Sequence, residues 1–324
     1  MIKNTCLAIF KLFILLSFAT SSVKGSPVYV DVGLYLLDIY NIDIQKESFS
    51  ADFYLWLSWV NPLKTSDFDP SALEVMNGEF TQVSKEATQK DGRNWVSMRY
   101  TGVFRTKYNF KEYPLDKQRL SIYFESSRYD SEELVFVVSP QRRQPEYRIS
   151  CSGWEMDGTP ITQVNDFNYH STFGNPRRSE SESAVYSRLA IIFPLQHTAS
   201  YWTYLKLFLP VYISVAIAFL TFLINPTDMD PRFGVGVAAI FGGVSSLIVA
   251  NTTIPETPYF SLSDKIHLVS LGFIFMTILS SCILLKICRE CNLEKIKRFD
   301  LYGGGGLLVL YAIIMAAITV SALI

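Results

Sequence analysis

The stretch DPRFGVGVAAIFGGVSSLIVANTTIP, residues 230–255, decides how this chain is built. It is apolar enough to cross a bilayer as a helix, because about 20 apolar residues span the hydrocarbon layer. It nevertheless opens with an acid and a base, and small or polar residues recur along it. A helix that only faced lipid would have no use for such groups, so this helix is expected to face something else.

Helical spacing divides the stretch into three faces. The first face combines an acid and hydroxyl groups with apolar residues, and consists of Asp230, Gly234, Ala238, Phe241, Ser245, Ile248 and Thr252. A second face consists of small residues and suits close packing against other membrane helices, and the third is bulky and apolar. Hydroxyl groups and a charge at membrane depth favour a water-filled lumen, which only a ring of subunits can enclose. The spacing alone fits an interior helix of an ordinary four-helix bundle equally well.

The composition of the whole chain agrees with a membrane protein. Of its 324 residues, 49% are hydrophobic and only 18% are charged, which is unusually apolar for a soluble protein. Its 29 Lys and Arg residues are balanced by 30 acids, so the charge gives no basic footprint and we expect no nucleic-acid partner.

Four apolar blocks predict four transmembrane helices and lie at 202–224, 233–254, 262–288 and 307–324. The basic cluster at 286–298 places the linker between the third and fourth helices in the cytoplasm. The chain is therefore expected to be a multi-pass protein of the cell (inner) membrane, surrounded by the lipid bilayer, with its N-terminal domain and its C-terminus on the periplasmic or extracellular side.

Three regions are predicted along the chain. Residues 1–25 have the lysine, short apolar run and small residues of a signal peptide, although an uncleaved anchor is an alternative. Residues 26–198 alternate in short apolar segments between turn residues, which predicts one all-β, immunoglobulin-like extracellular sandwich. Its expected strands are 28–44, 50–60, 95–105, 118–126, 133–139 and 187–195. Residues 199–324 form the predicted α-helical domain of four transmembrane helices.

The chain has few cysteines and no recognisable catalytic motif. The sandwich region contains only Cys151, so no disulfide is expected within it. Cys288 and Cys291 have the spacing of a metal-binding pair, but no histidine or second pair accompanies them, so we expect neither a metal nor a cofactor. No nucleotide loop, zinc-protease motif or nucleophile elbow is present, and the carboxylates that can be placed have no accompanying base, so we expect no enzyme.

Three motifs, in this order and spacing, resemble the pentameric ligand-gated ion channels, the Cys-loop receptor superfamily. They are YPLDKQ at 113–118, Pro210 in the first membrane block, and IPETPY at 254–259. Animal receptors bracket the first motif with a disulfide, and Thr106 and Leu120 stand at the matching positions. The chain is therefore similar to the bacterial, disulfide-free members. The arginine usually found before the first membrane helix is also missing, which leaves Asp116 without its usual partner.

The resemblance implies a homopentamer with permeant ions in its lumen. Rings of Phe241 and Ile248 would form apolar constrictions, and a ring of Asp230 at the cytoplasmic mouth would favour cations. An anion-selective channel is the alternative, because PRFGVG at 231–236 resembles the opening of the same helix in animal anion channels and Arg232 could face the lumen. A nonconducting, membrane-anchored ligand sensor is the other alternative.

The resemblance also implies a small extracellular ligand bound between neighbouring sandwiches. The matching positions are Tyr54, Glu74, Glu125, Tyr169 and Tyr186, and aromatic rings with carboxylates suit an ammonium ligand. Taken singly, each tyrosine is better explained as a half-buried strand residue. Arginines 177 and 178, on the long hairpin, could instead meet an anion. Protons are the second candidate agonist, acting through Asp230 and His197.

Coupling between the two domains is implied for the motif loops. In the family, the loop that matches YPLDKQ presses on the connection between the second and third membrane helices. The positions expected to carry this contact are Tyr113, Pro114, Asp116, Pro255 and Tyr259.

Overall fold

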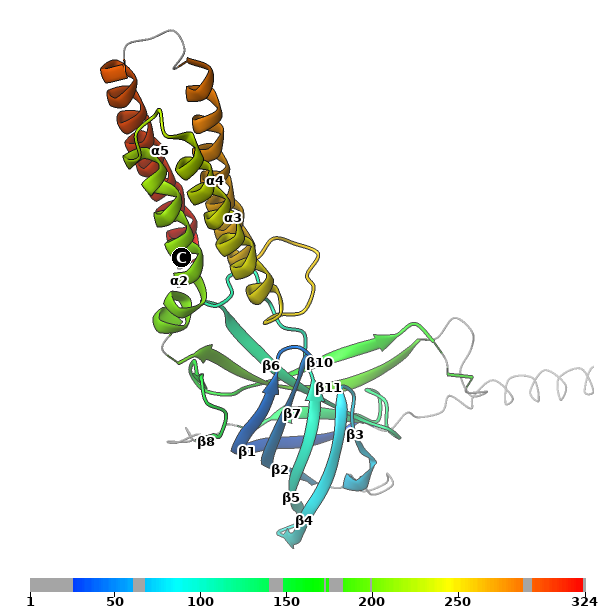
Figure 1. Cartoon of the computed structure of the whole chain (residues 1–324). Coiled ribbons are helices and arrows are strands. Elements are labelled where there is room, and N and C mark those ends of the chain that lie inside the picture. The colour runs from blue at the N-terminus through cyan, green and yellow to red at the C-terminus, as the bar shows by residue number, and fades with distance from the viewer. Residues whose placement is uncertain are drawn as a thin grey trace, which may run out of the picture.

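The computed structural model describes residues 26–60, 68–139, 148–171, 173–174, 183–198, 200–287 and 293–322. A β-sandwich comes first, and four long helices rise from one end of it (Figure 1). The predicted signal peptide, the hairpin residues Arg177 and Arg178, and Cys288 and Cys291 lie outside the described residues.

The sandwich consists of two sheets. Sheet A has the order β4 (Gly78–Lys90), β5 (Arg93–Arg105), β2 (Ser48–Val60), β1 (Val28–Asp43) and β7 (Leu134–Val138), with β8 (Arg148–Ile149) beside β1. Sheet B has the order β10 (Ile161–Tyr169), β11 (Ala184–His197), β6 (Lys117–Ser126) and β3 (Leu73–Val75), with β9 (Trp154–Met156) beside β11. A 3-10 turn, η1 (Pro70–Ala72), precedes β3. Strand β1 runs parallel to β7 and β8, and the other pairs are antiparallel.

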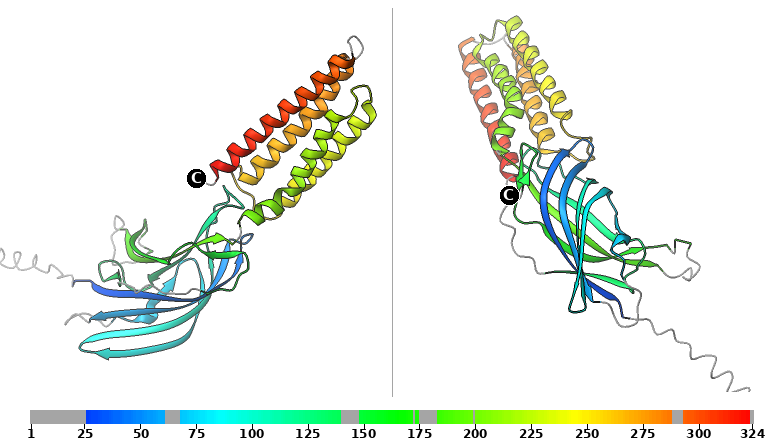
Figure 2. Two further views of the ribbon diagram at one scale, coloured as in Figure 1. Left: turned by 90° about the vertical axis from the view of Figure 1, so that its left-hand side faces the viewer. Right: turned by 90° about the horizontal axis from the view of Figure 1, so that it is seen from below.

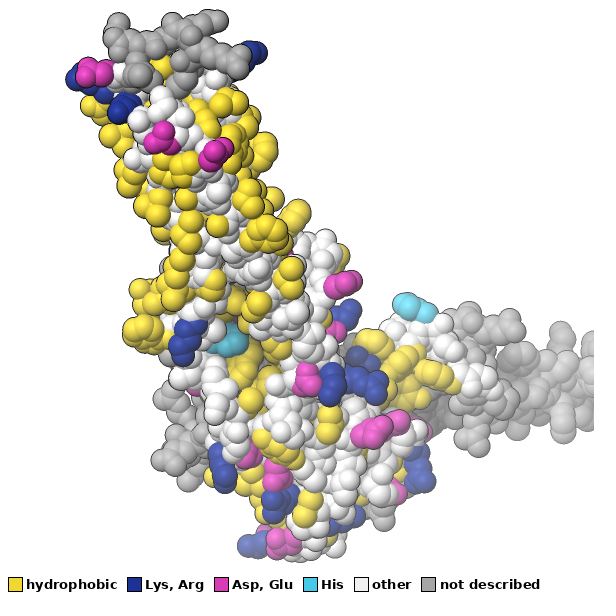
Figure 3. All heavy atoms as spheres, in the orientation of Figure 1, with side chains coloured by type: hydrophobic (Ala, Val, Ile, Leu, Met, Phe, Trp, Pro, Cys, Tyr) yellow, Lys and Arg dark blue, Asp and Glu magenta, His cyan; other side chains and the backbone are white. Residues whose placement is uncertain are grey.

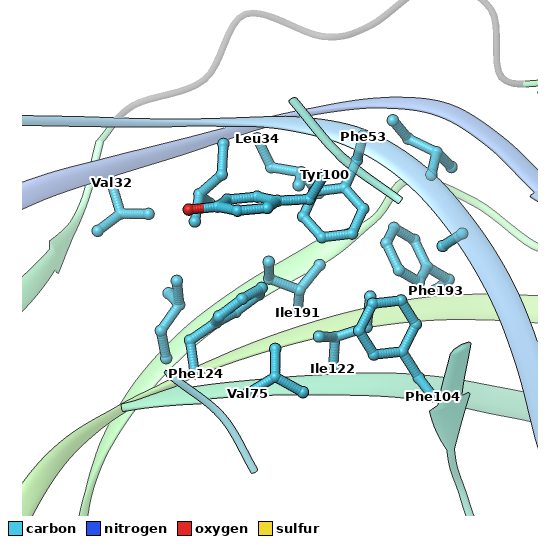
Figure 4. Packing of buried hydrophobic residues seen from close by; sticks show 14 of the residues in the cluster. Val32, Leu34, Phe53, Val75, Tyr100, Phe104, Ile122, Phe124, Ile191 and Phe193 are labelled. Atoms are coloured by element: carbon cyan, nitrogen blue, oxygen red, sulfur yellow. The ribbon is translucent and has the colours of Figure 1, made fainter. Parts of the chain in front are cut away.

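Alternate residues of the long strands fill the space between the sheets. In β2, Phe53, Leu55 and Leu57 are fully buried, and the residues between them face outward. The Phe53 ring meets the Phe124 ring of sheet B edge to face, with centroids 6.1 Å apart (Figure 4). Burial of each such side chain contributes about 1.5–3 kcal/mol, so this core holds the two sheets together.

The six predicted strands correspond to β1, β2, β5, β6, β7 and β11. The sequence reading did not find β4 or β10. Almost every residue of β4 is exposed, and most of β10 faces solvent as well. Strands that bury few side chains carry little alternation of apolar and polar residues, which is the signal that identified the others.

The helical domain consists of α2 (Ser200–Leu220), the 3-10 turn η2 (Thr221–Leu223), α3 (Met229–Asn251), α4 (Leu262–Ile287) and α5 (Leu293–Ser321). All four α-helices are long and apolar enough to cross a membrane. Helix α5 begins at Leu293 and not at the predicted residue 307, because the polar turns and the glycine run before the apolar block continue the same helix.

Surface chemistry separates the two domains. Apolar side chains cover the visible sides of the helices, whereas charged side chains gather on the sandwich and at the far end of the helices (Figure 3). The C-terminal end of α5 returns to the sandwich end of the bundle, as the views in Figure 2 also show. This is the arrangement of a multi-pass membrane protein.

Candidate functional site

Helix α3 packs through its face of small residues. Its buried residues are Arg232, Gly236, Ala239, Gly243, Ser246 and Ala250. A methyl group at Gly236 would lie 2.6 Å from the Ile278 side chain of α4, so this approach leaves little room for a larger residue. Small residues therefore seat α3 against its neighbours and fix which of its sides is turned away from them.

The side turned away is the face with the predicted lumen residues. Asp230, Gly234, Ala238, Phe241, Ser245, Ile248 and Thr252 are all exposed in the single chain. Phe241 is 71% exposed and Ile248 is 60% exposed. The structure thus brings these seven residues onto one open face of α3, where further copies of the chain can cover them.

Arg232 lies inside the bundle. Its side chain is fully buried, forms an ion pair with Asp300 of α5, and donates a hydrogen bond from Nε to the Thr221 carbonyl at 3.0 Å. The possibility that Arg232 lines a lumen beside Asp230 is therefore wrong, because helical geometry turns the two side chains to different sides. The pairing of Arg232 with Asp300 was not predicted from the sequence, because the two residues lie 68 positions apart in the chain.

A buried histidine joins α3 to α4. Nδ1 of His267 lies 2.8 Å from the Ser263 carbonyl, which can only accept, so Nδ1 carries the proton. Nε2 then accepts from the Ser246 hydroxyl of α3 at 3.0 Å. The side chain is fully satisfied, and the bond fixes the register between the two helices.

Four of the five predicted ligand residues lie together on sheet B. They surround a cavity of about 380 Å³ whose lining is Glu74, Met76, Glu125, Ser126, Ser127, Tyr169, Phe173 and Tyr186. Tyr54, the fifth, belongs to the outward-facing residues of β2 in sheet A. The outer surfaces of the two sheets lie on opposite sides of the sandwich. Within one chain, Tyr54 is therefore not part of this cavity.

Glu125 already has a cationic partner. Its side chain is 4% exposed and forms an ion pair with Nε of Arg188, a residue of β11. The Tyr169 hydroxyl donates to the other carboxylate oxygen at 2.8 Å and accepts from Nη2 of Arg188 at 3.0 Å. Burial raises the pKa of Tyr169, the Glu125 carboxylate adds to the rise, and Arg188 opposes it. Glu125 therefore has partners within the chain, and its place in a ligand site stays a prediction.

The sequence reading missed Arg188. Its guanidinium carbon lies 3.4 Å from the ring centroid of Phe167, and the rings of Tyr123 and Tyr169 lie 5.6 and 6.0 Å away. The available signal was a charged residue in a segment otherwise read as an apolar strand. Such a residue needs a partner when the strand is buried.

Asp116 finds its partner in His197. Asp116 is 3% exposed, and its Oδ1 lies 3.4 Å from Nε2 of His197, at the end of the strand that leads into α2. The Trp154 ring packs on the imidazole at a centroid distance of 3.9 Å. Tyr113 is also buried beside them, and desolvation, with a smaller effect of Asp116, raises the pKa of Tyr113 to about 12. Histidine thus occupies the place of the missing arginine.

The loop of YPLDKQ contacts the connection between α3 and α4. The Phe110 N–H donates to the Tyr259 hydroxyl at 3.1 Å, and the Leu262 N–H donates to the Lys111 carbonyl at 2.8 Å. Gln45, from the turn between β1 and β2, donates to the Thr252 carbonyl at 2.9 Å. These bonds link the sandwich to both ends of the connection.

At the same junction, an apolar side chain of each domain packs against the other domain. Ile254 belongs to the buried cluster of the sandwich, and Leu115 packs against the cluster formed by the helices. Of the residues predicted for coupling, Pro114 is buried in the loop beside Leu115, and Pro255 lines a cavity of about 580 Å³ together with Tyr259. A movement of the loop therefore has direct mechanical routes to the end of α3.

Metal binding has no support within the described ranges. No group of three or more His, Cys, Asp or Glu side chains in that part of the chain is placed to hold a metal ion. Cys151 and Cys282 are free thiols.

Comparison with known proteins gives a consistent result. No family model matches the chain. The chain is 21% identical over 277 residues to a proton-gated ion channel of Gloeobacter violaceus, covering 79% of this chain and 73% of that protein. It is 21% identical over 284 residues to the gamma-aminobutyric acid receptor subunit pi of Bos taurus, and 21% identical over 280 residues to the glycine receptor subunit beta of Homo sapiens.

These matches extend across both domains. They cover 81% and 79% of this chain, although it spans only 62% and 54% of the two receptor subunits. All three relatives are channels or receptor subunits and none is an enzyme. The structure agrees with these matches, because a β-sandwich is followed by four helices that are long and apolar enough to cross a membrane. The chain belongs to the pentameric ligand-gated ion channel family.

Proposed function

We propose that five copies of this chain form a cation-selective channel opened by a small extracellular ligand. Residues 26–198 form the ligand-binding domain on the periplasmic or extracellular side of a cell (inner) membrane, after removal of residues 1–25, and residues 199–324 form the pore domain. Similarity to the proton-gated ion channel of Gloeobacter violaceus supports an ion channel that responds to an external signal.

The observation that carries this proposal is the open face of α3. Phe241 and Ile248 stand on it as large exposed apolar side chains, with Ser245 between them. A ring of five such faces encloses a lumen with two apolar constrictions, which can close by excluding water. A helix that served only as an anchor would need neither the polar positions nor the acid at its end.

Charge at the cytoplasmic mouth supports cation selectivity. Asp230 is exposed on the lumen face, whereas Arg232 is buried and neutralised by Asp300. A ring of carboxylates raises the local concentration of cations and repels anions. The buried ion pair keeps the Arg232 charge away from the proposed lumen, which supports cation over anion selectivity.

Ion-substitution recording on Asp230→Asn tests the selectivity. In a sodium chloride gradient the wild-type current is expected to reverse near the sodium potential. The variant is expected to reverse closer to zero, because the ring loses its charge. The control is Asp228→Asn, an exposed acid just before the helix, for which a smaller shift is expected. A wild-type current that reverses at the chloride potential would contradict cation selectivity.

The ligand site is proposed to form between two neighbouring chains. The cavity at Glu74 lies on sheet B of one chain, and Tyr54 lies on the outward face of sheet A. In a ring, the sheet B face of one chain can meet the sheet A face of the next, which would bring Tyr54 to the cavity. A small amine is the first candidate ligand, because the cavity combines tyrosine rings with the exposed carboxylate of Glu74.

Protons are the second candidate, favoured by His197. Histidine changes its charge between about pH 5 and 8, and its protonated form is attracted to the Asp116 carboxylate 3.4 Å away. The titratable side chains of Asp116 and Tyr113 both lie beside it.

A further inference from the structure

The cavity on sheet B contains a cation that belongs to the protein. The Arg188 guanidinium stacks on Phe167 at 3.4 Å, pairs with Glu125, and donates to Tyr169. Its side chain is 18% exposed. Stacking on an aromatic face, an ion pair with a carboxylate and a hydrogen bond to a phenol are the contacts by which proteins bind ammonium ligands.

Strand register explains why a positive charge is needed there. Glu74 of β3 and Glu125 of β6 are directly opposite each other in the antiparallel pairing. Two like charges at opposite positions destabilise a strand pair, and the buried Glu125 would also lack compensation for its desolvation. Arg188 supplies the compensating charge, so the cavity keeps only the exposed Glu74 carboxylate uncompensated by an ion pair among the described residues.

We propose that Arg188 determines the ligand specificity of this cavity by occupying, as a resident cation, the place that a simple ammonium group would otherwise take. The inference rests on the proposed ligand site. An amine that enters the wild-type cavity can pair with Glu74, or it must displace the Arg188 guanidinium from its three partners. Because the guanidinium is part of the chain, it loses no translational entropy by occupying the cavity, whereas a free ligand does. The wild-type cavity therefore binds simple amines only weakly, through Glu74, and loss of the Arg188 charge converts it into a tighter amine site.

Calorimetric titration of n-propylammonium chloride into the purified full-length protein tests the proposal. Arg188→Gln keeps a side chain that can donate to Glu125 but removes the positive charge. It is expected to bind n-propylammonium at least about tenfold more tightly than wild type, since the probe gains both the ring face and the carboxylate. Glu125→Gln/Arg188→Gln removes both charges and is expected to lose most of this gain.

Two further variants control for fold and charge. Arg93→Gln removes another arginine of the sandwich, which pairs with Asp31 on sheet A, and is expected to bind the probe as wild type does. Arg188→Lys retains a resident cation and protects the fold, and its affinity is expected to stay within about threefold of wild type. A tenfold rise in Arg188→Lys would contradict the proposal, as would equal affinities, or no detectable binding, in wild type and Arg188→Gln.

The binding pattern separates this proposal from the proposed channel function. The expected pattern in a protein that carries no current would argue against conduction and leave the resident cation in place. Equal amine affinities in a protein that conducts would overturn the role of Arg188 and leave the channel in place.

Discussion

The buried pair of Arg232 and Asp300 is stable only while each side chain has its partner. Replacement of Asp300 by Asn leaves a buried guanidinium without a counter-charge, which costs about 3–5 kcal/mol where one member of such a pair is removed. Thermal unfolding of the purified protein is therefore expected at a clearly lower temperature for Asp300→Asn. The exposed Asp228→Asn serves as the control and is expected to unfold as wild type does.

The double variant Arg232→Met/Asp300→Leu separates the charge from the packing. It removes both charges and fills the space with apolar side chains, which is often neutral or stabilising in buried pairs. Its unfolding temperature is expected to recover relative to Asp300→Asn. A double variant no more stable than the single one would show that the pair contributes through its shape and not through mutual neutralisation.

His197 is expected to make the junction between the domains sensitive to pH. Its imidazole lies 3.4 Å from the Asp116 carboxylate, so the charge on residue 197 bears directly on the contact between the domains. His197→Arg carries a permanent charge at this position and should reduce the pH dependence of the current between pH 5 and 8. An unchanged pH dependence in His197→Arg would assign proton sensitivity to another group.

Helix α5 depends on one glycine of its four-glycine run. A methyl group at Gly304 would lie 2.4 Å from the buried Phe222 ring, whereas one at Gly303 meets nothing within 4 Å. Gly303→Ala is expected to raise stability by up to about 1 kcal/mol through helix propensity. Gly304→Ala is expected to lower it by about 1–3 kcal/mol through overpacking. Denaturation of the two variants in parallel checks this, and a Gly304→Ala variant as stable as Gly303→Ala would contradict the close packing.

The sequence predicts elements well where one face is buried. The spacing of small residues in α3 identified the side that packs, and all of its members are buried. Strand β2, with alternate buried residues, was found at nearly its full length, whereas the exposed β4 was not. The alternation of apolar and polar residues reflects which side chains are buried, so elements that bury few side chains show little of it.

Partners across strands could not be predicted from the sequence. Arg188 and Glu125 lie 63 residues apart, and His197 meets Asp116 only because β9, β11 and the loop before β6 come together. Strand register fixes which side chains meet, and a shift of one residue would turn Arg188 to the other face. Four of the candidate ligand positions line one cavity, whereas the charge that Arg188 brings to that cavity could not be predicted.

The whole chain is organised so that its two domains share contacts at one junction. Ile254 packs into the sandwich core, Leu115 packs into the helices, and Gln45 bonds to the end of α3. A ligand on the sandwich can shift the pore only by binding one conformation more tightly than the other. These contacts are the physical route by which such a preference can reach the face of α3.

The most direct test of a lumen lined by α3 uses a variant that needs no agonist. Phe241→Ser replaces the proposed apolar ring by hydroxyl groups, which lowers the barrier to water and ions. Cells with this variant at their surface are expected to carry a standing current that reverses near the sodium potential, while the matched Phe275→Ser, at an exposed position of α4, carries none. A Phe241→Ser protein at the surface that passes no standing current, or one that reverses at the chloride potential, would contradict the proposed cation pore.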